Sequence, residues 1–213
     1  MTSRAEMLDG IRSSLAKSAA FEDLYHHLQP SPRKSDRHAS ALSPTELAER
    51  FSTELTSVGG EVHRAANEER AVEAIREVLA NIGATNAAIS DLELLKSIDG
   101  PDIELIENPS REQLFAVDAG ITAAQLAIAE TGTLVLRSAS ERHRLVSLVP
   151  PVHICLLRTN DIRPTMHDVL EEMSNAIDPT ITFITGPSRT SDIELTLAIG
   201  VHGPKRLIVV LID

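Results

Sequence analysis

The sequence predicts an α/β protein in which helices flank a mostly parallel β-sheet. Short apolar runs rich in β-branched residues alternate with stretches of helical periodicity. Continuous apolar strands of this kind are typical of a parallel sheet that is buried on both faces. The chain has 213 residues, of which 42% are hydrophobic and 24% are charged. That length and composition suffice for one sizeable core and exclude a wholly disordered chain.

Residues 1–42 are predicted to form an N-terminal helical arm and a flexible linker. Met7, Ile11 and Leu15 recur every four positions, as on one side of an amphipathic helix. Residues 29–40 are polar and rich in Pro and Ser, which is typical of a linker. Such an arm can pack on another protein, on a second copy of the chain or on its own domain.

The folded body, residues 43–213, is expected to open with two capped helices. Ser43 and Glu46 have the spacing of a capping box, so a helix should begin there and run to about residue 58. Asn67 should cap a second helix that ends near Gly83. Further helices are expected at 109–114, 122–128, 165–176 and 190–199. Strands are expected at 61–65, 86–90, 103–106, 115–118, 133–137, 152–158, 181–185 and 207–212.

The charge balance restricts the class of partner. The net charge is −11, from 31 acidic and 20 basic residues, and the acidic excess lies in residues 51–135. Nucleic acid is a poor partner, because phosphate binding needs a basic stripe. The aromatic content of 2% also leaves few platforms for base stacking. A small anion, in contrast, responds only to the charges close to it. Basic residues cluster at 137–144, and this cluster is either an anion-binding patch or a solvated face.

Neither a membrane span nor a metal site is predicted. No run approaches the roughly 18 uncharged apolar residues of a transmembrane helix, and residues 1–10 lack the apolar segment of a secretory signal. The single cysteine, Cys155, can form no internal disulfide and cannot alone hold an iron–sulfur cluster. The histidines and carboxylates show no metal-ligand spacing. We therefore expect a cytoplasmic chain without a metal or cofactor of its own and without membrane insertion.

The turn after the strand at 181–185 is the strongest candidate site. Ser191 and Glu194 have capping-box spacing and predict a helix start. The free N–H groups of a helix start suit a carboxylate or phosphate, although a well-capped helix without a ligand is an equally simple interpretation. The candidate ligand-binding residues are Gly186, Ser188, Arg189, Thr190, Asp192 and Glu194.

Two carboxylates are candidate catalytic groups. Glu130 lies in Ala129-Glu-Thr-Gly-Thr133 and can act as a nucleophile or base, or it can pair with Arg142, itself a candidate ligand-binding residue. Asp118 precedes Gly120 at the expected end of a strand, where a carboxylate can be catalytic or can cap a turn. The hydroxyls and backbone donors near Glu130 add the ligand-binding candidates Thr131, Gly132 and Thr133.

His202 is the candidate acid/base histidine. It lies in a turn beside Gly203, which is a further ligand-binding candidate, and it can bind a ligand carboxylate or simply fix its own turn. Ligand sites of parallel sheets lie beyond the carboxyl ends of the strands. We therefore expect the bends at 129–133, 186–192 and 200–204 to converge on one polar cleft at a rim of the sheet.

The second half of the chain holds the motifs Gly186-Pro-Ser-Arg-Thr-Ser-Asp-Ile-Glu194, Gly200-Val-His-Gly-Pro204 with a closing strand to Asp213, Ala129-Glu-Thr-Gly-Thr133, Arg144-Leu145 and Ser147-Leu-Val-Pro-Pro-Val-His153. Together they resemble the LUD domain and, within it, the lactate utilization protein C family (LutC/YkgG). The resemblance covers about residues 44–213 and is most specific in 129–213.

The resemblance implies a fold similar to that of the sugar-phosphate isomerases and CoA-transferases (NagB/RpiA/CoA-transferase-like). It also implies a role in oxidising L-lactate to pyruvate, for growth on lactate, beside partner proteins that carry iron–sulfur clusters. The chain would then be a component of that system rather than an independent catalyst. Two alternatives stay open: an autonomous isomerase or CoA-transferase-like enzyme that uses Glu130 or Asp118, and a regulatory module that senses a small anion.

Overall fold

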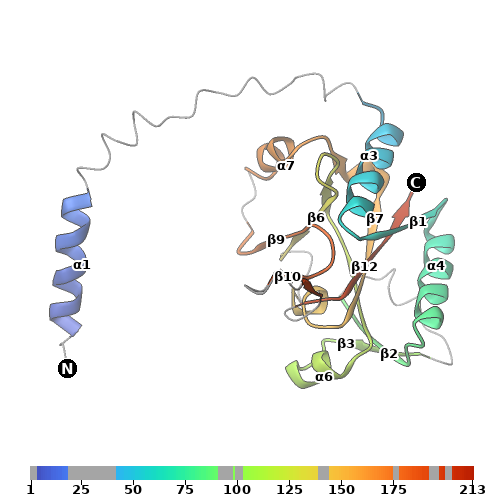
Figure 1. Cartoon of the computed structure of the whole chain (residues 1–213), viewed down its shortest axis with the longest axis horizontal. Helices are drawn as coiled ribbons and strands as arrows, with labels where there is room; N and C mark the ends of the chain where they lie inside the picture. The colour runs from blue at the N-terminus through green and yellow to red at the C-terminus, as the bar shows by residue number, and fades with distance from the viewer. Residues whose placement is uncertain are drawn as a thin grey trace. The chain divides into compact units, whose positions relative to one another are not determined.

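A computed structural model describes residues 4–18, 42–90, 98, 103–138, 144–174, 178–191, 197–199 and 203–213 (Figure 1). The chain divides into two units, Met1–His38 and Ala39–Asp213, and each is described by itself. α1 (Arg4–Ser18) belongs to the first unit and confirms the predicted N-terminal helix. In the described ranges, no helix has the length and apolar character that crossing a membrane requires.

Six parallel strands form the central sheet of the second unit, in the order β1-β12-β7-β4-β2-β3. In that order the strands span Glu61–Ala65, Arg206–Ile212, Val152–Arg158, Ala119–Ala123, Asn86–Ile89 and Glu104–Glu107. β12 and β7 are interior strands and are buried along almost their whole length, which accounts for their continuous apolar sequences. The predicted α/β architecture with a mostly parallel sheet is confirmed.

Helices pack on both faces of the central sheet. α4 (Glu68–Asn81) buries Ile75 on one face, in a core that includes Ile154 of β7. α3 (Pro44–Ser57) buries Phe51 in the core of the opposite face. Because side chains alternate along a strand, neighbouring residues of β7 contribute to the two cores in turn.

The starts of both helices confirm the predicted caps. The Ser43 hydroxyl accepts the Glu46 N–H, and the Glu46 carboxylate accepts the Ser43 N–H at 2.7 Å. The Asn67 side chain accepts the Arg70 N–H at 2.9 Å at the start of α4. These signals are local, so they can be read from the sequence without knowledge of the tertiary structure.

A second sheet of four strands, ordered β8-β5-β6-β9, shares a core with α3 and the central sheet. In that order its strands span Ile162–Arg163, Leu126–Ile128, Thr133–Arg137 and Ile181–Ile184. β6 is antiparallel to β5 and β9, and its Leu134 faces the shared core. Val135 faces the other way, into a core formed with α7 (Met166–Met173). Two short 3-10 helices, η3 (Arg144–Ser147) and η4 (Thr159–Asp161), precede and follow β7.

Two predicted elements in the middle of the chain are wrong. The helix expected at 122–128 is instead the end of β4 followed by β5, because pairing with β7 and β6 outweighs the helix propensity of an Ala-rich segment. The strand expected at 115–118 is wrong because α6 (Arg111–Ala116), capped by Ser110, continues through Phe115.

The helix expected at 190–199 is also wrong. β10 (Arg189–Ser191) and β11 (Leu197–Ile199) lie there and pair antiparallel, with Ser191 opposite Leu197. Ser191, the predicted cap of that helix, therefore lies in a strand. Residues 192–196 and 200–202 lie outside the described residues.

Candidate functional site

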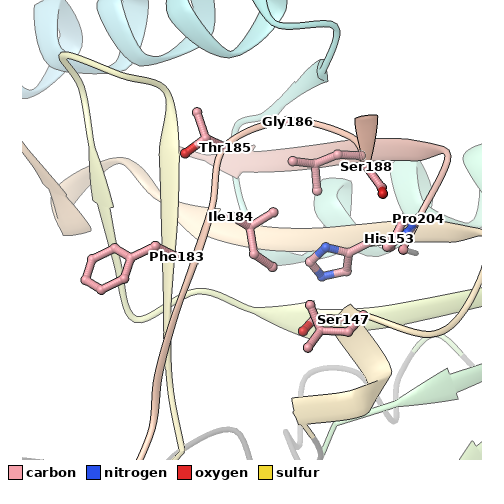
Figure 2. Close-up of a pocket in the computed structure, with 11 residues that line it drawn as sticks. Ser147, His153, Phe183, Ile184, Thr185, Gly186, Ser188 and Pro204 are labelled. Carbon is pink, nitrogen blue, oxygen red and sulfur yellow. The ribbon is translucent and has the colours of Figure 1, made fainter. Parts of the chain in front are cut away.

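A cavity of about 240 Å³ lies where η3, β7, β9 and β12 meet (Figure 2). Its lining residues are Ser147, Leu148, His153, Phe183, Ile184, Thr185, Gly186, Ser188, Gly203, Pro204 and Leu207. None of these residues carries an acidic side chain. The volume is below the roughly 300–1,000 Å³ of sites for drug-sized ligands, so the cavity suits a small molecule.

Two of the predicted bends meet at this cavity. The Ser188 N–H donates to the Pro204 carbonyl at 2.8 Å, which joins the turn after β9 to the turn before β12. Gly203 lies so close that a Cβ added to it would be 3.2 Å from the Ser188 Cβ. The close approach of these two turns places Gly186, Ser188 and Gly203 on one wall.

The third bend reaches the cavity through a row of hydroxyl groups. Thr133 Oγ1 lies 2.6 Å from Thr185 Oγ1 and 2.7 Å from Thr131 Oγ1. Thr185 lines the cavity, whereas Thr131 and Thr133 do not. Gly132 faces α3 instead, since a Cβ added to it would lie 2.3 Å from the Leu55 nitrogen. The bend at 129–133 therefore contacts the lining residue Thr185 but does not itself line the cavity.

The position of the cavity on the central sheet differs from the expected one. His153 and Leu207 are the second residues of β7 and β12 and lie opposite each other, near the amino ends of those strands. Only the segment from Thr185 to Ser188 follows a carboxyl end, that of β9. The cavity lies at this place because the second sheet packs over the α3-facing side of the central sheet.

His153 is a cavity residue that the sequence analysis did not name as a candidate; of the lining residues it named only Gly186, Ser188 and Gly203. Its side chain is completely buried, and its Nε2 lies 2.8 Å from Thr122 Oγ1. Burial lowers the pKa of His153 from 6.5 to about 3, so the ring is neutral at physiological pH. Figure 2 shows the ring between Ile184 and Ser147. The available signal was a single imidazole in the otherwise apolar start of a predicted strand.

A basic residue lies next to the cavity. Arg144 of η3 lines a smaller hollow of about 10 Å³ together with Ser138 and Thr180. Ser147 lines both this hollow and the main cavity. Arg144 belongs to the basic cluster at 137–144, so part of that cluster lies beside the candidate site.

Arg189 does not line the cavity. Its guanidinium donates to the Val58 carbonyl at 2.6 Å, at the carboxyl end of α3. Gly59 follows with a φ of +90°, and a Cβ added there would collide with the guanidinium at 2.6 Å. Arg189 therefore holds the turn after α3, and Gly59 leaves the room that it needs.

The two candidate catalytic carboxylates also lie away from the cavity. Glu130 accepts the Met166 N–H at 2.8 Å, at the first residue of α7. Asp118 accepts the Thr85 N–H at 2.8 Å and the Asn86 N–H at 3.3 Å. Asp118 comes just before β4 rather than at its carboxyl end, and it fixes the turn into β2.

The remaining candidates cannot be placed. His202, Arg142, Asp192 and Glu194 lie outside the described residues, as does the side chain of Thr190. Within the described part of the chain, no group of three or more His, Cys, Asp or Glu side chains gathers as for a metal ion.

The parallel sheet, its helices and the small cavity at η3, β7, β9 and β12 define an α/β domain with a candidate site for a small molecule. The LUD domain family matches residues 48–212. The chain therefore belongs to the LUD domain family, as its motifs indicated.

Curated relatives confirm the resemblance to lactate utilization protein C. A protein of that name from Deinococcus radiodurans is 38% identical over 117 residues, which are 53% of this chain and 55% of that protein. Another, from Halalkalibacterium halodurans, is 29% identical over 80% of this chain and 81% of that protein. In the first relatives matched, the chain spans about half of the relative's length.

A solved structure has the same fold. A crystal structure of a DUF162 family protein from Deinococcus radiodurans superposes with a TM-score of 0.65 and 24% identity. The match covers 81% of this chain and 99% of that one. This likeness concerns the fold alone.

Proposed function

We propose that this chain is a lactate utilization protein and acts as a component of a system that oxidises L-lactate to pyruvate. Relatives named lactate utilization protein C support the proposal, together with membership of the LUD domain family. In this proposal the electrons leave through partner proteins that carry iron–sulfur clusters. Cys155, the one cysteine of the chain, is completely buried, so it offers no surface thiolate to a cluster.

The proposed ligand of the cavity is a small carboxylate. The observation that carries this proposal is a cavity of about 240 Å³ with hydroxyl groups on its wall and a basic residue, Arg144, in the hollow beside it. Arg144 would attract the carboxylate, and Ser188 would supply a hydroxyl donor to its oxygens. The Ser147 hydroxyl donates to the Arg144 carbonyl at 2.8 Å and so helps to hold η3 at the cavity. The absence of acidic side chains from the lining favours an anion although the whole chain carries a net charge of −11.

We propose a component of a larger system rather than an independent isomerase or CoA-transferase. An independent reaction of that type would place Glu130 or Asp118 at the ligand. Each carboxylate instead accepts backbone N–H groups away from the cavity. Neither residue belongs to the cavity lining.

Growth of a deletion strain tests the role in lactate use. Removing the gene should abolish growth on L-lactate and leave growth on pyruvate intact, because pyruvate enters metabolism after the proposed step. Restoring the full chain should restore growth. Unchanged growth of the deletion strain on L-lactate contradicts the proposed function.

Thermal unfolding with added ligands tests the cavity. A small carboxylate at 100 times its dissociation constant should stabilise the chain by about 2.7 kcal/mol. Arg144→Gln should weaken this effect, whereas Arg70→Gln, which removes an exposed charge on α4, should not. Equal weakening by both variants would point to a general charge effect and against a site beside Arg144.

A further inference from the structure

His153 Nδ1 is a buried polar atom without a hydrogen-bond partner. Among the described residues, it and Ser90 Oγ are the two buried side-chain polar atoms in this state. Buried polar atoms in native proteins are nearly always paired, because losing water without a replacement is costly. His153 also lines the cavity. An unpaired atom at a cavity wall is expected to find its partner in what the cavity binds.

The neighbours of the ring favour the tautomer that has a bare Nδ1. The contact between Thr122 Oγ1 and His153 Nε2 at 2.8 Å fits either tautomer. The contact of the Thr122 hydroxyl with Cys155 Sγ at 3.5 Å favours the one in which the Thr122 oxygen accepts from Nε2. A neutral imidazole carries one proton, and in the favoured tautomer that proton is on Nε2. Nδ1 therefore offers a lone pair and accepts a hydrogen bond. It cannot donate one to a carboxylate or a ketone.

We propose that His153 Nδ1 accepts a hydrogen bond from the hydroxyl group of a 2-hydroxy acid in the cavity, so that the cavity prefers a 2-hydroxy acid to the matching 2-oxo acid. This inference rests on the proposed function in one respect, the binding of a small carboxylate in the same cavity. It adds a residue and a direction of preference. A 2-oxo acid presents an oxygen lone pair where Nδ1 also has one, and the two repel.

The two polar groups of the ligand would bind to different sides of the cavity. Arg144 lies on the η3 side and takes the carboxylate, while His153 on β7 takes the neighbouring hydroxyl. Ser147 connects the two regions because it lines both the cavity and the hollow beside it. A site that binds the hydroxy acid more tightly than the oxo acid would hold the reduced compound and release the oxidised one.

The state of the ring can be measured on the full chain without a ligand. Nitrogen-15 NMR of the histidine side chains should show one ring with its proton on Nε2 that keeps this state between pH 5 and 8. Thr122→Val should disturb that signal, because the hydroxyl that fixes the tautomer is gone. A proton on Nδ1, or a charged ring at pH 6, overturns the inference without any binding experiment.

Affinities for three acids test the recognition. Wild-type protein should bind L-lactate about tenfold more tightly than pyruvate or propionate, as expected for one hydrogen bond at a buried atom. His153→Asn should bring the lactate-to-pyruvate ratio close to one, because an amide both donates and accepts. Thr122→Val should lower the same ratio by releasing the tautomer. His167→Asn, at an exposed histidine of α7, is the matched control and should keep the wild-type ratio.

Each contrary result is informative. Equal binding of lactate and pyruvate by the wild-type protein means that Nδ1 is paired with water only and overturns the inference, while the small-carboxylate site stands. No binding of any of the three acids overturns both the inference and the carboxylate site. The growth test on L-lactate decides the proposed cellular role separately.

Discussion

The Nε2 atom of His153 lies 2.8 Å from Oγ1 of Thr122, across the adjacent strands β7 and β4. The pair is completely buried in the central sheet. A neutral imidazole is compatible with this position, but an imidazolium is not, because charge is poorly solvated there. The same residue therefore links the proposed recognition to the stability of the fold.

The free energy of unfolding should fall as the pH drops below 6.5, because His153 must remain neutral in the folded chain. Burial depresses the pKa of this histidine to about 3 in the folded chain, whereas an unfolded chain binds the proton near pH 6.5. The stabilising contribution is thus fully present above 6.5 and is lost as the pH falls toward 3. Between pH 6.5 and 5 the expected loss is about 2 kcal/mol.

Urea unfolding at pH 7.5 and pH 5.0 measures this loss. His153→Asn should lack it, so the stability of the variant should change less between the two pH values than that of the wild type. The range above pH 5 limits the contribution of carboxylates, most of which are still ionised there. Parallel pH profiles for the two proteins would contradict the prediction.

Glu130 is predicted to stabilise α7 rather than to act on the ligand. Its carboxylate accepts the N–H of Met166, one of the donors that a helix start leaves unpaired. Glu130→Ala should cost about 1 kcal/mol of stability, as for loss of a helix cap, and should leave the affinity of the cavity for small acids unchanged. Calorimetry with and without ligand separates the two effects.

Glu171→Gln on the same helix is the control for Glu130. Glu171 is exposed near the carboxyl end of α7, where a negative charge gives no cap, so its loss should be almost neutral. If Glu130→Ala lost function while its stability stayed like that of the wild type, the catalytic role predicted from the sequence would gain support.

The elements that the sequence predicted best depend on local signals or on uniform burial. The caps at Ser43 and Asn67 lie within three residues of their partners, and β7 and β12 are apolar along their length because both faces of the sheet are covered. Those features can be read from neighbouring residues in the sequence. They also predicted the α/β class correctly.

The features that were missed depend on distant partners. β5 became a strand because Leu126 pairs with Val135 across a turn, and β10 because it pairs with β11. Arg189 is occupied by the carbonyl of Val58, which lies 131 positions earlier in the chain. His153 becomes a candidate only when its depth and its unpaired nitrogen are known. None of these relationships has a spacing that a single sequence reveals.

The ion pair between Arg137 and Asp178 should matter more than the one between Arg158 and Glu68. The Asp178 side chain is only 3% exposed and lies 2.5 Å from Arg137, whereas about half of each side chain in the second pair is exposed. Arg137→Leu should cost about 3 kcal/mol, since it removes the ion-pair partner of a buried carboxylate. Arg158→Leu should cost less than about 1 kcal/mol.

Urea unfolding of both variants at low and high salt checks this comparison. Salt should reduce the small effect at Arg158, because exposed pairs are screened, and it should leave most of the effect at Arg137. Similar costs at the two positions would mean that burial of Asp178 does not govern the strength of the pair.

Gly120 should be intolerant of any side chain, because η3 crosses the central sheet at this point. A Cβ added to Gly120 would lie 2.0 Å from the Val146 carbonyl oxygen, and backbone cannot give way as a flexible side chain can. Gly120→Ala should therefore destabilise the chain by about 3 kcal/mol. It should also weaken binding of small acids, since the displaced η3 carries Ser147 of the cavity wall.

Gly83→Ala is the control. Its Cβ would meet nothing within 4 Å, so only the positive φ of +67° costs energy, about 1 kcal/mol, and binding should not change. Equal losses of stability and binding in the two variants would show that contact with η3 does not set the shape of the cavity.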